Sequence, residues 1–507
     1  MSSNCNLFSR FSRCFPGEDN TFLTDDAGVC HTYADLEKKS SDIAYNLVEK
    51  GLRPGDRVTL IAQKSLNALW IYLGCLRAGA IFHPINPDYS KPEIVFFLND
   101  ARPKFLVTDG GASLKIGNLA SQVESIEEHL QIPLVDREGL LCPPENADQG
   151  NFPCHVNTPN DTAALLYSSG TTGDPKGICL THGNLYENAA SLCRAWQFSS
   201  NDVLLHVLPV FHVHGLFIAL GPVLVAGASM RYQNRFVVDE VIEALPNVTV
   251  LMGVPTFYSR LLDNPEFTSV SSRNIRVFIS GSAPLTESVF RRFEERTSHK
   301  ILERYGMTET GVNTSNPIDG DRIPESVGVV LPGVELRITD EEGIAIKDES
   351  VGAIEVRGDN VFPRYWGLAD KTREAFDEAG WFGTGDQGSM NSNGYLFISG
   401  RSKDMIITGG LNVYPKEVER VLDKFSGIIE SSVFGVPHSD FGEGVMAAVV
   451  MKANVPLEQQ RVIEALNEQL ARFKIPKHIV ALEELPRNAM GKVMKTELRT
   501  SYASFFS

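Results

Sequence analysis

A short apolar segment, Thr162–Tyr167, runs directly into a loop of glycines and hydroxyl residues that ends at Lys176. The loop residues that could contact an anion are Ser168, Ser169, Gly170, Thr171 and Thr172. Glycines allow backbone N–H groups to converge on a phosphate, hydroxyls add donors, and the lysine adds a mobile positive charge. The spacing does not fit the Walker A loop, so a strand followed by another type of phosphate-binding loop is predicted. On this segment alone, an ordinary flexible loop is the alternative.

The segments before this loop alternate between strand and helix patterns. Helical spacing of apolar residues predicts helices at 31–51 and 66–78. Short apolar runs predict strands at 57–62, 80–85 and 104–108. This alternation indicates an α/β fold with a parallel sheet covered by helices.

The pattern changes after about residue 320, where short alternating segments and turns such as Asn393-Gly394 indicate antiparallel strands. A final α+β segment is predicted from about Asp404 to the end of the chain. The polar, proline-containing segment 110–160 is interpreted as a peripheral connection.

The composition narrows the class of protein. The chain has 507 residues, 43% of them hydrophobic and 22% charged, which is typical of folded proteins with more than one domain. A formal net charge of -16 argues against nucleic acid as the main partner. The apolar run His214–Met230 is too short to span a bilayer, so it is predicted to be a buried helix. The eight scattered cysteines form no C-x-x-C pair and indicate free thiols in a reducing compartment.

The first seventeen residues contain Arg10 and Arg13 and no acidic residue, a weak resemblance to an organelle transit peptide. An amphipathic helix that belongs to the fold is the preferred interpretation. Its predicted core-facing residues are Leu7, Phe8, Phe11 and Phe15. A cytoplasmic location is therefore expected, with a mitochondrial location as the alternative.

Four later motifs accompany the phosphate loop: Tyr305–Glu309, Thr384–Asp386, Gly400–Asp404 and Asn488–Lys492. Together the five motifs resemble those of the adenylate-forming superfamily, which includes acyl-CoA synthetases, luciferases and peptide-synthetase adenylation domains. The resemblance covers essentially the whole chain. It implies an ATP- and acyl-binding domain at 1–401, with mixed and parallel sheets covered by helices. It also implies a smaller, mobile α+β domain at 402–507, with a hinge near Lys403.

The reaction that this resemblance implies joins a carboxylate to the α-phosphate of ATP, so two anions must be brought together while pyrophosphate leaves. Thr172 and Glu309 are implied ligands of Mg2+, which prefers hard oxygen atoms. Thr308 is implied to contact the α-phosphate, and His212 to lie beside the acyl carboxylate. Lys492 is implied to be the mobile cation between the carboxylate and the α-phosphate.

The same resemblance assigns the nucleoside end of ATP. Asp386 is expected to accept the ribose hydroxyls and Arg401 to reach the ribose. Tyr305 is expected to offer an aromatic face to adenine, and Ser282 is a further expected nucleotide contact.

Two other patterns suggest different proteins and are not favoured. The segment Gly383–Gly388 reads G-x-G-x-x-G, but turns and a strand follow it instead of the helix that opens a dinucleotide site. His206, His212 and His214 have no cysteine or acidic residue among them, so a zinc site is not favoured. No G-x-S-x-G motif is present, which argues against a serine-based acyltransferase.

Four stretches within 206–317 resemble malonyl-CoA synthetases more closely than the superfamily at large. A dicarboxylate requires a fixed cation for its second carboxylate, and the planar fork of arginine suits this role. Arg260 is the first candidate, because a helix that begins at Pro255 would place it on the same face as Phe257. Arg304 and Arg276 are weaker candidates, since both could be structural ion-pair partners.

The predicted function is ATP-dependent ligation of a small dicarboxylate, malonate or methylmalonate, to coenzyme A through an acyl-adenylate. Mg2+ is the expected cofactor, and AMP and pyrophosphate are the expected by-products. Another short or medium carboxylate, or the loading of a separate carrier protein, is the alternative. Because no carrier domain follows Lys492, coenzyme A is the expected acceptor. The chain is expected to be a monomer or homodimer, without nucleic acid or a membrane span.

Overall fold

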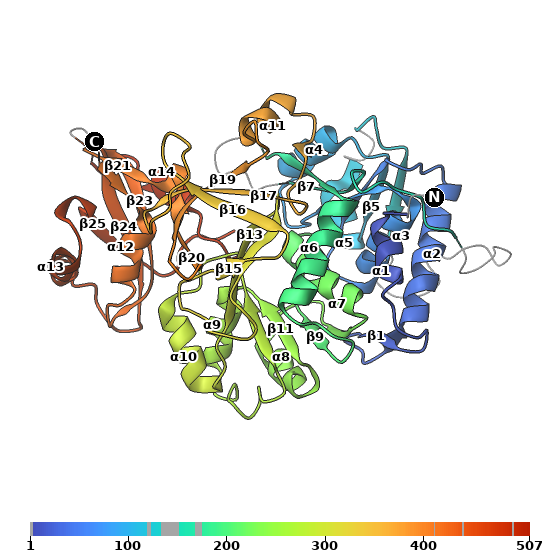
Figure 1. Cartoon of the computed structure of the whole chain (residues 1–507), viewed down its shortest axis with the longest axis horizontal. Coiled ribbons are helices and arrows are strands. Elements are labelled where there is room, and N and C mark those ends of the chain that lie inside the picture. The colour runs from blue at the N-terminus through green and yellow to red at the C-terminus, as the bar shows by residue number, and fades with distance from the viewer. Residues whose placement is uncertain are drawn as a thin grey trace.

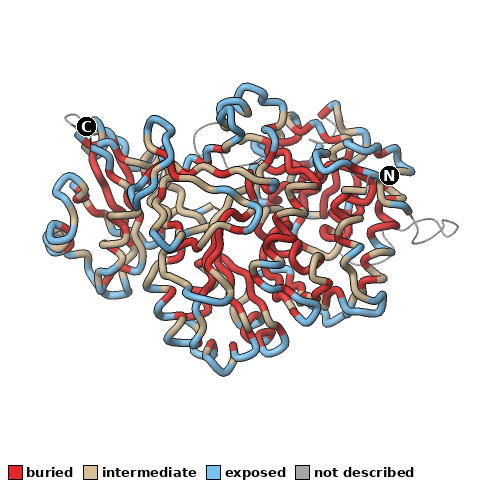
Figure 2. The backbone as a smooth tube through the Cα atoms, in the orientation of Figure 1, coloured by how far each residue is buried: buried red, intermediate tan, exposed pale blue. Residues whose placement is uncertain are grey.

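The computed structural model describes residues 4–118, 123–132, 152–167, 175–409, 411–438, 441–488 and 491–506. A large N-terminal body is followed by a smaller C-terminal lobe, which Figure 1 shows in orange and red at one end of the molecule. Buried backbone runs through both parts (Figure 2), and each part has its own hydrophobic core. None of the helices in the described ranges is long and apolar enough to cross a membrane.

One sheet of the body has the strand order β18-β8-β7-β4-β3-β5-β6. Its parallel strands are β3 (Arg57–Ile61), β4 (Ile81–Ile85), β5 (Phe105–Thr108), β6 (Glu128–Gln131) and β7 (Thr162–Tyr167). Antiparallel pairing then adds β8 (Gly177–Thr181) and β18 (Arg364–Tyr365). The strands predicted at 57–62, 80–85 and 104–108 are confirmed within one residue at each end.

Helices α2 (Tyr33–Glu49) and α3 (Leu66–Ala78) confirm the two helices predicted in this region. The N-cap of α3 is Ser65, whose side chain accepts a hydrogen bond from the Ala68 amide, and the helix ends at Gly79, whose positive φ of 74° suits glycine. Gly74 allows α2 to approach closely, because a Cβ there would lie 2.4 Å from the Ile43 side chain.

The interpretation of 110–160 as a peripheral connection is wrong for its first part. Helix α5 (Gly110–Ile116) is followed by β6, which pairs in parallel with β5 and extends the sheet. Leu130 is the one buried residue of β6, so an edge strand this short and polar has little hydrophobic periodicity to detect. Residues 119–122 and 133–151 lie outside the described ranges.

The second sheet has the order β15-β14-β13-β12-β11-β9-β10-β1-β2. Its central parallel strands are β9 (Val203–His206), β10 (Ser229–Tyr232), β11 (Val250–Gly253), β12 (Val277–Ser280) and β13 (Leu302–Met307). The outer strands are β1 (Thr21–Thr24), β2 (Cys30–Thr32), β14 (Gly311–Ser315) and β15 (Val329–Val330). Ligands of open α/β sheets bind beyond the carboxyl ends of such parallel strands.

The first helix of this half precedes β9, and the others alternate with the strands along the chain. They are α6 (His182–Ala195), α7 (Leu220–Ala226), α8 (Val238–Ala244), α9 (Pro255–Asp263) and α10 (Glu287–Thr297). The apolar run His214–Met230 begins as a buried π-helical turn, His214–Ala219, that continues into α7. Gly227, with φ of 62°, ends the helix, so the predicted buried helix is confirmed but is shorter than the run.

The chain then forms an antiparallel sheet of order β16-β17-β19-β20. Its strands are β16 (Val334–Thr339), β17 (Gly352–Gly358), β19 (Phe382–Met390) and β20 (Leu396–Arg401). The G-x-G-x-x-G segment lies inside β19, which explains why it opens no helix. The antiparallel strands predicted after residue 320 are confirmed.

The C-terminal lobe is an α+β unit. Its sheet joins β21 (Ile406–Thr408), β22 (Leu411–Val413), β23 (Ile428–His438), β24 (Gly442–Met451) and β25 (His478–Leu482). Its helices are α12 (Pro415–Leu422), α13 (Gln459–Gln469) and α14 (Lys495–Ser501).

The N-terminal helix α1 (Leu7–Ser12) belongs to the fold of the body. Leu7, Phe8 and Phe11 are buried in the main core, and Phe15 packs against it, as the amphipathic pattern predicts. The described cysteines are free, in agreement with the predicted thiols.

Candidate active site

A carboxylate at the end of the body, Asp386, is held by two neighbouring side chains. The Tyr305 hydroxyl donates a hydrogen bond to Asp386 Oδ2 at 2.6 Å, and Arg401 Nε lies 3.1 Å from Asp386 Oδ1. Burial and the adjacent Asp386 raise the pKa of Tyr305 well above its usual value, so this hydroxyl stays a donor. The three residues come from β13, β19 and β20, and this convergence gives one fixed, buried acceptor for hydroxyl groups.

A second buried carboxylate, Glu309, follows β13. Its Oε1 accepts a hydrogen bond from the Tyr365 hydroxyl at 3.4 Å, and Lys176 Nζ lies 4.9 Å from the centre of the Tyr365 ring. Burial raises the pKa of Glu309. A buried carboxylate is suited to bind a cation, and its hard oxygen ligands fit Mg2+. Among the described residues there is no group of three or more potential metal ligands, so such an ion would need further oxygens from bound phosphates.

His212 and Thr308 line one cavity together with residues of β4 and Phe211. Burial lowers the pKa of His212 to about 4, so its imidazole is neutral at pH 7. Its Nε2 is buried and has no hydrogen-bond partner among the described residues. A neutral imidazole at a cavity wall can donate to or accept from a ligand without adding charge.

His214 lies beside Ser282, with 3.1 Å between His214 Nδ1 and Ser282 Oγ. Ser282 has a positive φ of 73°, which is uncommon for a residue other than glycine and frequent at binding sites. Burial, followed by the nearby Arg304, lowers the pKa of His214 well below its usual value. This contact joins the start of the π-helical turn to the segment that follows β12.

Arg304, on β13, is almost completely buried, with 4% of its surface exposed. Its Nε and Nη2 have no hydrogen-bond partner among the described residues. Burial lowers the pKa of its guanidinium to about 10, so the group remains charged at pH 7. The guanidinium packs against Gly281, where an added Cβ would lie 2.4 Å from Arg304 Cζ. A buried, unpaired cation is costly in a folded protein, so this arrangement indicates a site for an anion.

The other two arginine candidates have different surroundings. Arg260 lies on α9 and shares its face with the half-buried Phe257, but its own side chain is exposed. Arg276 is bonded to Asp202 through Nε at 2.6 Å and Nη2 at 3.0 Å, which is the structural ion pair considered for it.

The C-terminal lobe brings Lys492 to the body. A Cβ on the preceding residue, Gly491, would lie 3.3 Å from Thr256 Oγ1 at the start of α9. Burial and then Arg401 lower the pKa of Lys492 to about 8, and the same two causes lower the pKa of Lys403 to about 8. Lys403 lies in a short 3-10 turn, Ser402–Asp404, between the body and the lobe.

A further ion pair joins the two parts. Arg420 Nε on α12 lies 3.1 Å from Glu325 Oε1 in the body, and Glu325 has a positive φ of 65°.

Five of the predicted phosphate contacts, Ser168, Ser169, Gly170, Thr171 and Thr172, lie outside the described residues. The structure brings Tyr305 and Arg401 to Asp386, and it places His212 and Thr308 at one cavity. It also adds residues that the motif comparison missed. Tyr365 contacts Glu309 but belongs to no motif, and nothing in its sequence surroundings signals this role. His214 has a signal, since it stands two residues after His212 in the same apolar run.

Comparisons with known proteins agree with this geometry. The family model described as AMP-binding enzyme matches residues 9–366, and the model of the AMP-binding enzyme C-terminal domain matches residues 417–492. The chain belongs to the AMP-binding enzyme family. The protein is therefore an AMP-forming acid–CoA ligase, which uses a carboxylate, ATP and coenzyme A.

Several relatives share nearly the whole chain. The malonate–CoA ligase of Arabidopsis thaliana is 33% identical, over 89% of this chain and 79% of its own length. The mitochondrial malonate–CoA ligase of Mus musculus is 32% identical, over 96% of this chain and 89% of its own length.

The crystal structure of ATP-bound MatB from Rhodopseudomonas palustris is 42% identical, covers 99% of this chain and 100% of MatB, and superposes with a TM-score of 0.95. The apo form of MatB superposes with a score of 0.84. The whole chain thus superposes better on the ATP-bound form than on the apo form.

Proposed function

We propose that this protein is a malonyl-CoA synthetase and that Arg304 binds the carboxylate of malonate that does not react. The observation that carries the proposal is the buried guanidinium with Nε and Nη2 free of hydrogen bonds within the described residues. Two parallel N–H donors match the two oxygens of a carboxylate. A monocarboxylate would leave this cation buried without a partner. The names of the relatives, two of them malonate–CoA ligases, support the same substrate.

The burial of the candidates reverses the order that the sequence suggests. Arg304 replaces Arg260 as the first candidate, because a buried cation discriminates between anionic and neutral ligands far more strongly than an exposed one. Arg276 is excluded from this proposal by its bidentate contact with Asp202.

We assign the remaining residues either to the reacting acid or to the nucleotide. His212 and Thr308 lie together at one cavity wall, and we assign them to the reacting carboxylate and the α-phosphate. Asp386 accepts the ribose hydroxyls, with Arg401 and Tyr305 around it. Ser282 and Lys176 are further nucleotide contacts in this proposal.

Lys492 screens the repulsion between the carboxylate and the phosphate as they approach. Glu309 and Thr172 would hold Mg2+, which neutralises phosphate charge when bound. The body at 1–401 and the lobe at 402–507 act as separate domains in this scheme, with Lys403 as the hinge between two half-reactions.

The direct test is a product screen. Purified protein is incubated with ATP, Mg2+ and coenzyme A, together with malonate, methylmalonate, succinate, acetate, propionate or octanoate, and the products are identified by mass. We expect malonyl-CoA to form with the highest kcat/KM, accompanied by AMP and pyrophosphate. A higher kcat/KM for a monocarboxylate would refute the assignment of malonate and leave the ligase chemistry intact. A parallel reaction with a phosphopantetheinyl carrier protein in place of coenzyme A tests the acceptor.

A further inference from the structure

Lys64 is a buried lysine, with 6% of its surface exposed, in the connection that follows β3. Its Nζ lies 2.8 Å from His206 Nδ1, 2.8 Å from His206 O and 2.6 Å from Gln233 O. The amine also lies 4.2 Å from the centre of the Tyr232 ring. His206 ends β9 and Gln233 follows β10, so one side chain from the first sheet joins the carboxyl ends of two strands of the second.

The hydrogen bonds indicate which nitrogen atoms of Lys64 and His206 carry protons. His206 Nε2 lies 2.9 Å from Gly215 O, so this nitrogen carries a proton. Burial lowers the pKa of Lys64 well below its usual value, but the three acceptors around Nζ match the three protons of an ammonium group. If the shared proton moved to His206 Nδ1, the pair would still hold one positive charge. Within the described residues, its hydrogen-bond partners are neutral acceptors, and the Asp26 carboxylate favours the charged form of Lys64 through its charge.

The His206–Gly215 bond closes the segment 206–215 into a compact loop. The backbone of Gly215 packs against the Pro209 carbonyl, because an added Cβ would lie 2.1 Å from Pro209 O. The Leu216 amide donates to His212 O at 2.9 Å. His212 therefore projects from a loop whose base is bonded to Lys64, and its side chain reaches the cavity that contains Thr308.

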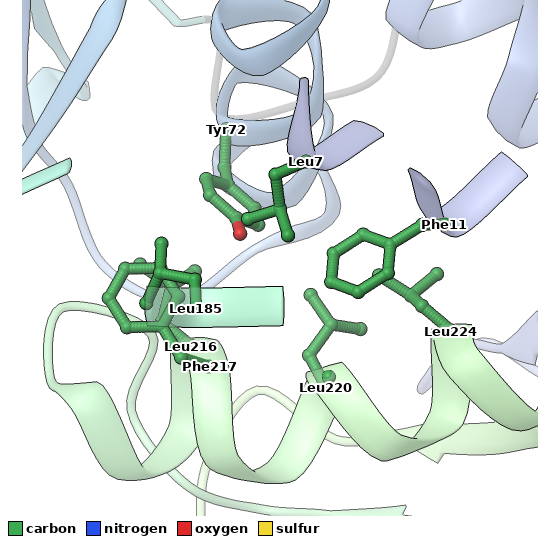
Figure 3. A pocket seen from close by; sticks show the side chains of 9 residues that line it. Leu7, Phe11, Tyr72, Leu185, Leu216, Phe217, Leu220 and Leu224 are labelled. Atoms are coloured by element: carbon green, nitrogen blue, oxygen red, sulfur yellow. The ribbon is translucent and has the colours of Figure 1, made fainter. Parts of the chain in front are cut away.

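The π-helical turn that follows is held on its other side by apolar packing. Figure 3 shows Leu216 and Phe217 facing Leu7, Phe11 and Tyr72 across an apolar cavity. Such turns have an extra residue relative to an α-helix and occur often at functional sites. Apolar contacts are not directional, so they hold the turn in place without fixing its rotation. Directional restraints on this segment come from the Lys64–His206–Gly215 chain at its base and from the His214–Ser282 hydrogen bond at the start of the turn.

We propose that Lys64 and His206 are positioning residues for the acid-binding side of the active site. The ammonium of Lys64 orients the His206 ring, and the ring holds Gly215 and thereby aims His212 at the acyl carboxylate. Tyr305 and Asp386, on the nucleotide side, lie on other strands and share no hydrogen bond with this chain of contacts within the described residues, whereas Ser282 bonds to His214, next to Gly215. This inference rests on the acid–CoA ligase activity and uses malonate as the acid from the proposed function.

The test measures the effect on the use of malonate separately from the effect on the use of ATP. Lys64→Met removes all three donors and keeps an unbranched side chain that is one heavy atom shorter. We expect kcat/KM for malonate to fall by about 10- to 100-fold, as a displaced catalytic group does, while KM for ATP changes by less than about 3-fold. The kinetics are measured by AMP release, with thermal unfolding as a check that each variant is folded.

Two substitutions of His206 test whether a replacement hydrogen-bond donor preserves activity. His206→Gln keeps a donor that can reach Gly215 O, whereas His206→Leu keeps none. The glutamine variant should stay within about 5-fold of wild type for malonate, and the leucine variant should resemble Lys64→Met. Tyr33→Phe is the matched control, because it removes one buried hydrogen bond, to Ala228 O at 2.6 Å, at the opposite end of β10. It should change neither KM.

Three results would overturn the proposal: equal increases in KM for ATP and malonate, a glutamine variant as impaired as the leucine variant, or wild-type kinetics in Lys64→Met. If Lys64→Met does not fold, the two His206 variants decide, since both leave the ammonium bonded to two carbonyls. If wild-type protein does not use malonate, the proposed substrate fails, and the same comparison is made with the acid that the screen identifies.

Discussion

Replacing Arg304 with methionine would remove the buried guanidinium and keep an unbranched apolar stem. The two hydrogen-bond donors Nε and Nη2, which have no partner within the described residues, would be lost together. The same substitution at the exposed Arg260 is the matched control, because it removes an arginine from the neighbouring helix α9 without altering a buried charge.

The expected loss of activity follows from the burial of the charge. Breaking a buried, hydrogen-bonded charge pair costs about 2 to 5 kcal/mol. The kcat/KM for malonate should therefore decrease by a factor of between about 30 and several thousand. Propionate has no second carboxylate, so its kcat/KM should change by less than about 3-fold or increase. Arg260→Met should lower kcat/KM for malonate by less than about 3-fold, since exposed ion pairs contribute little.

The thermal stability of the ligand-free enzyme, unlike its activity, should stay the same or increase in Arg304→Met. The charged form of Arg304 is present at pH 7 in both folded and unfolded chains, and burial lowers its pKa to about 10. The corresponding cost of burying the charge is on the order of 3 kcal/mol, because each pKa unit is about 1.4 kcal/mol. Arg304→Met should therefore keep or raise the Tm of the ligand-free protein, and malonate should no longer raise it further.

The assay measures AMP release with malonate and with propionate, and Tm by differential scanning fluorimetry with and without malonate. Gly281→Ala offers an independent route to the same site, since its methyl group would collide with the guanidinium. It should reduce kcat/KM for malonate without removing the charge. If Arg304→Met lowers Tm and impairs both acids equally, Arg304 is a scaffold residue and the reasoning from its unpaired donors is wrong.

Four other outcomes test the nucleotide side and the movement of the lobe. Lys492→Ala should lower adenylate formation by at least about 100-fold and spare thioester formation from pre-made malonyl-adenylate, which chromatography of both half-reactions would show. Because Lys492 is charged below its pKa of about 8, kcat/KM of adenylate formation should fall as pH rises from 8 to 10. The same decrease should be present in the Lys403→Met variant. Lys403→Pro should preserve one half-reaction and block the other, because proline fixes φ; an unchanged overall rate would contradict the hinge. Arg420→Ala should slow adenylate formation by about 2- to 5-fold in stopped-flow measurements by removing the contact with Glu325, with no effect if that pair is not used during catalysis.

Much of the fold could be predicted because its signals are local. The helix α3 coincides with the helix predicted at 66–78, and the structure shows Ser65 and Gly79 as its caps. Strand β7 coincides with the predicted segment Thr162–Tyr167 because it is an uninterrupted apolar run. The edge strand β6 was missed because its sequence is mostly polar, and its pairing with β5 depends on the sheet rather than on itself.

The site was less predictable, for a physical reason. Motifs identify residues that contact the nucleotide, but they do not give the burial of a side chain. Arg260 and Arg304 are the same residue type in the sequence. In the structure the Arg260 side chain is exposed, whereas Arg304 has 4% of its surface exposed. Lys64 is 142 residues from His206, and only the approach of two sheets creates their contact. Such long-range contacts leave no periodicity in the sequence.

The proposed function requires an acidic chain to select a dianion, and the distribution of charge offers a physical route to this. The formal net charge is -16, so the surface as a whole repels malonate and ATP at long range. In the proposed site the balance is reversed, because Arg304 provides a buried positive charge whose Nε and Nη2 have no hydrogen-bond partner among the described residues. Ions in solution screen the distant surface charges over about 10 Å, but they do not enter the buried site. Selection therefore depends on desolvated cations at short range, and it should persist at salt concentrations that abolish the long-range repulsion.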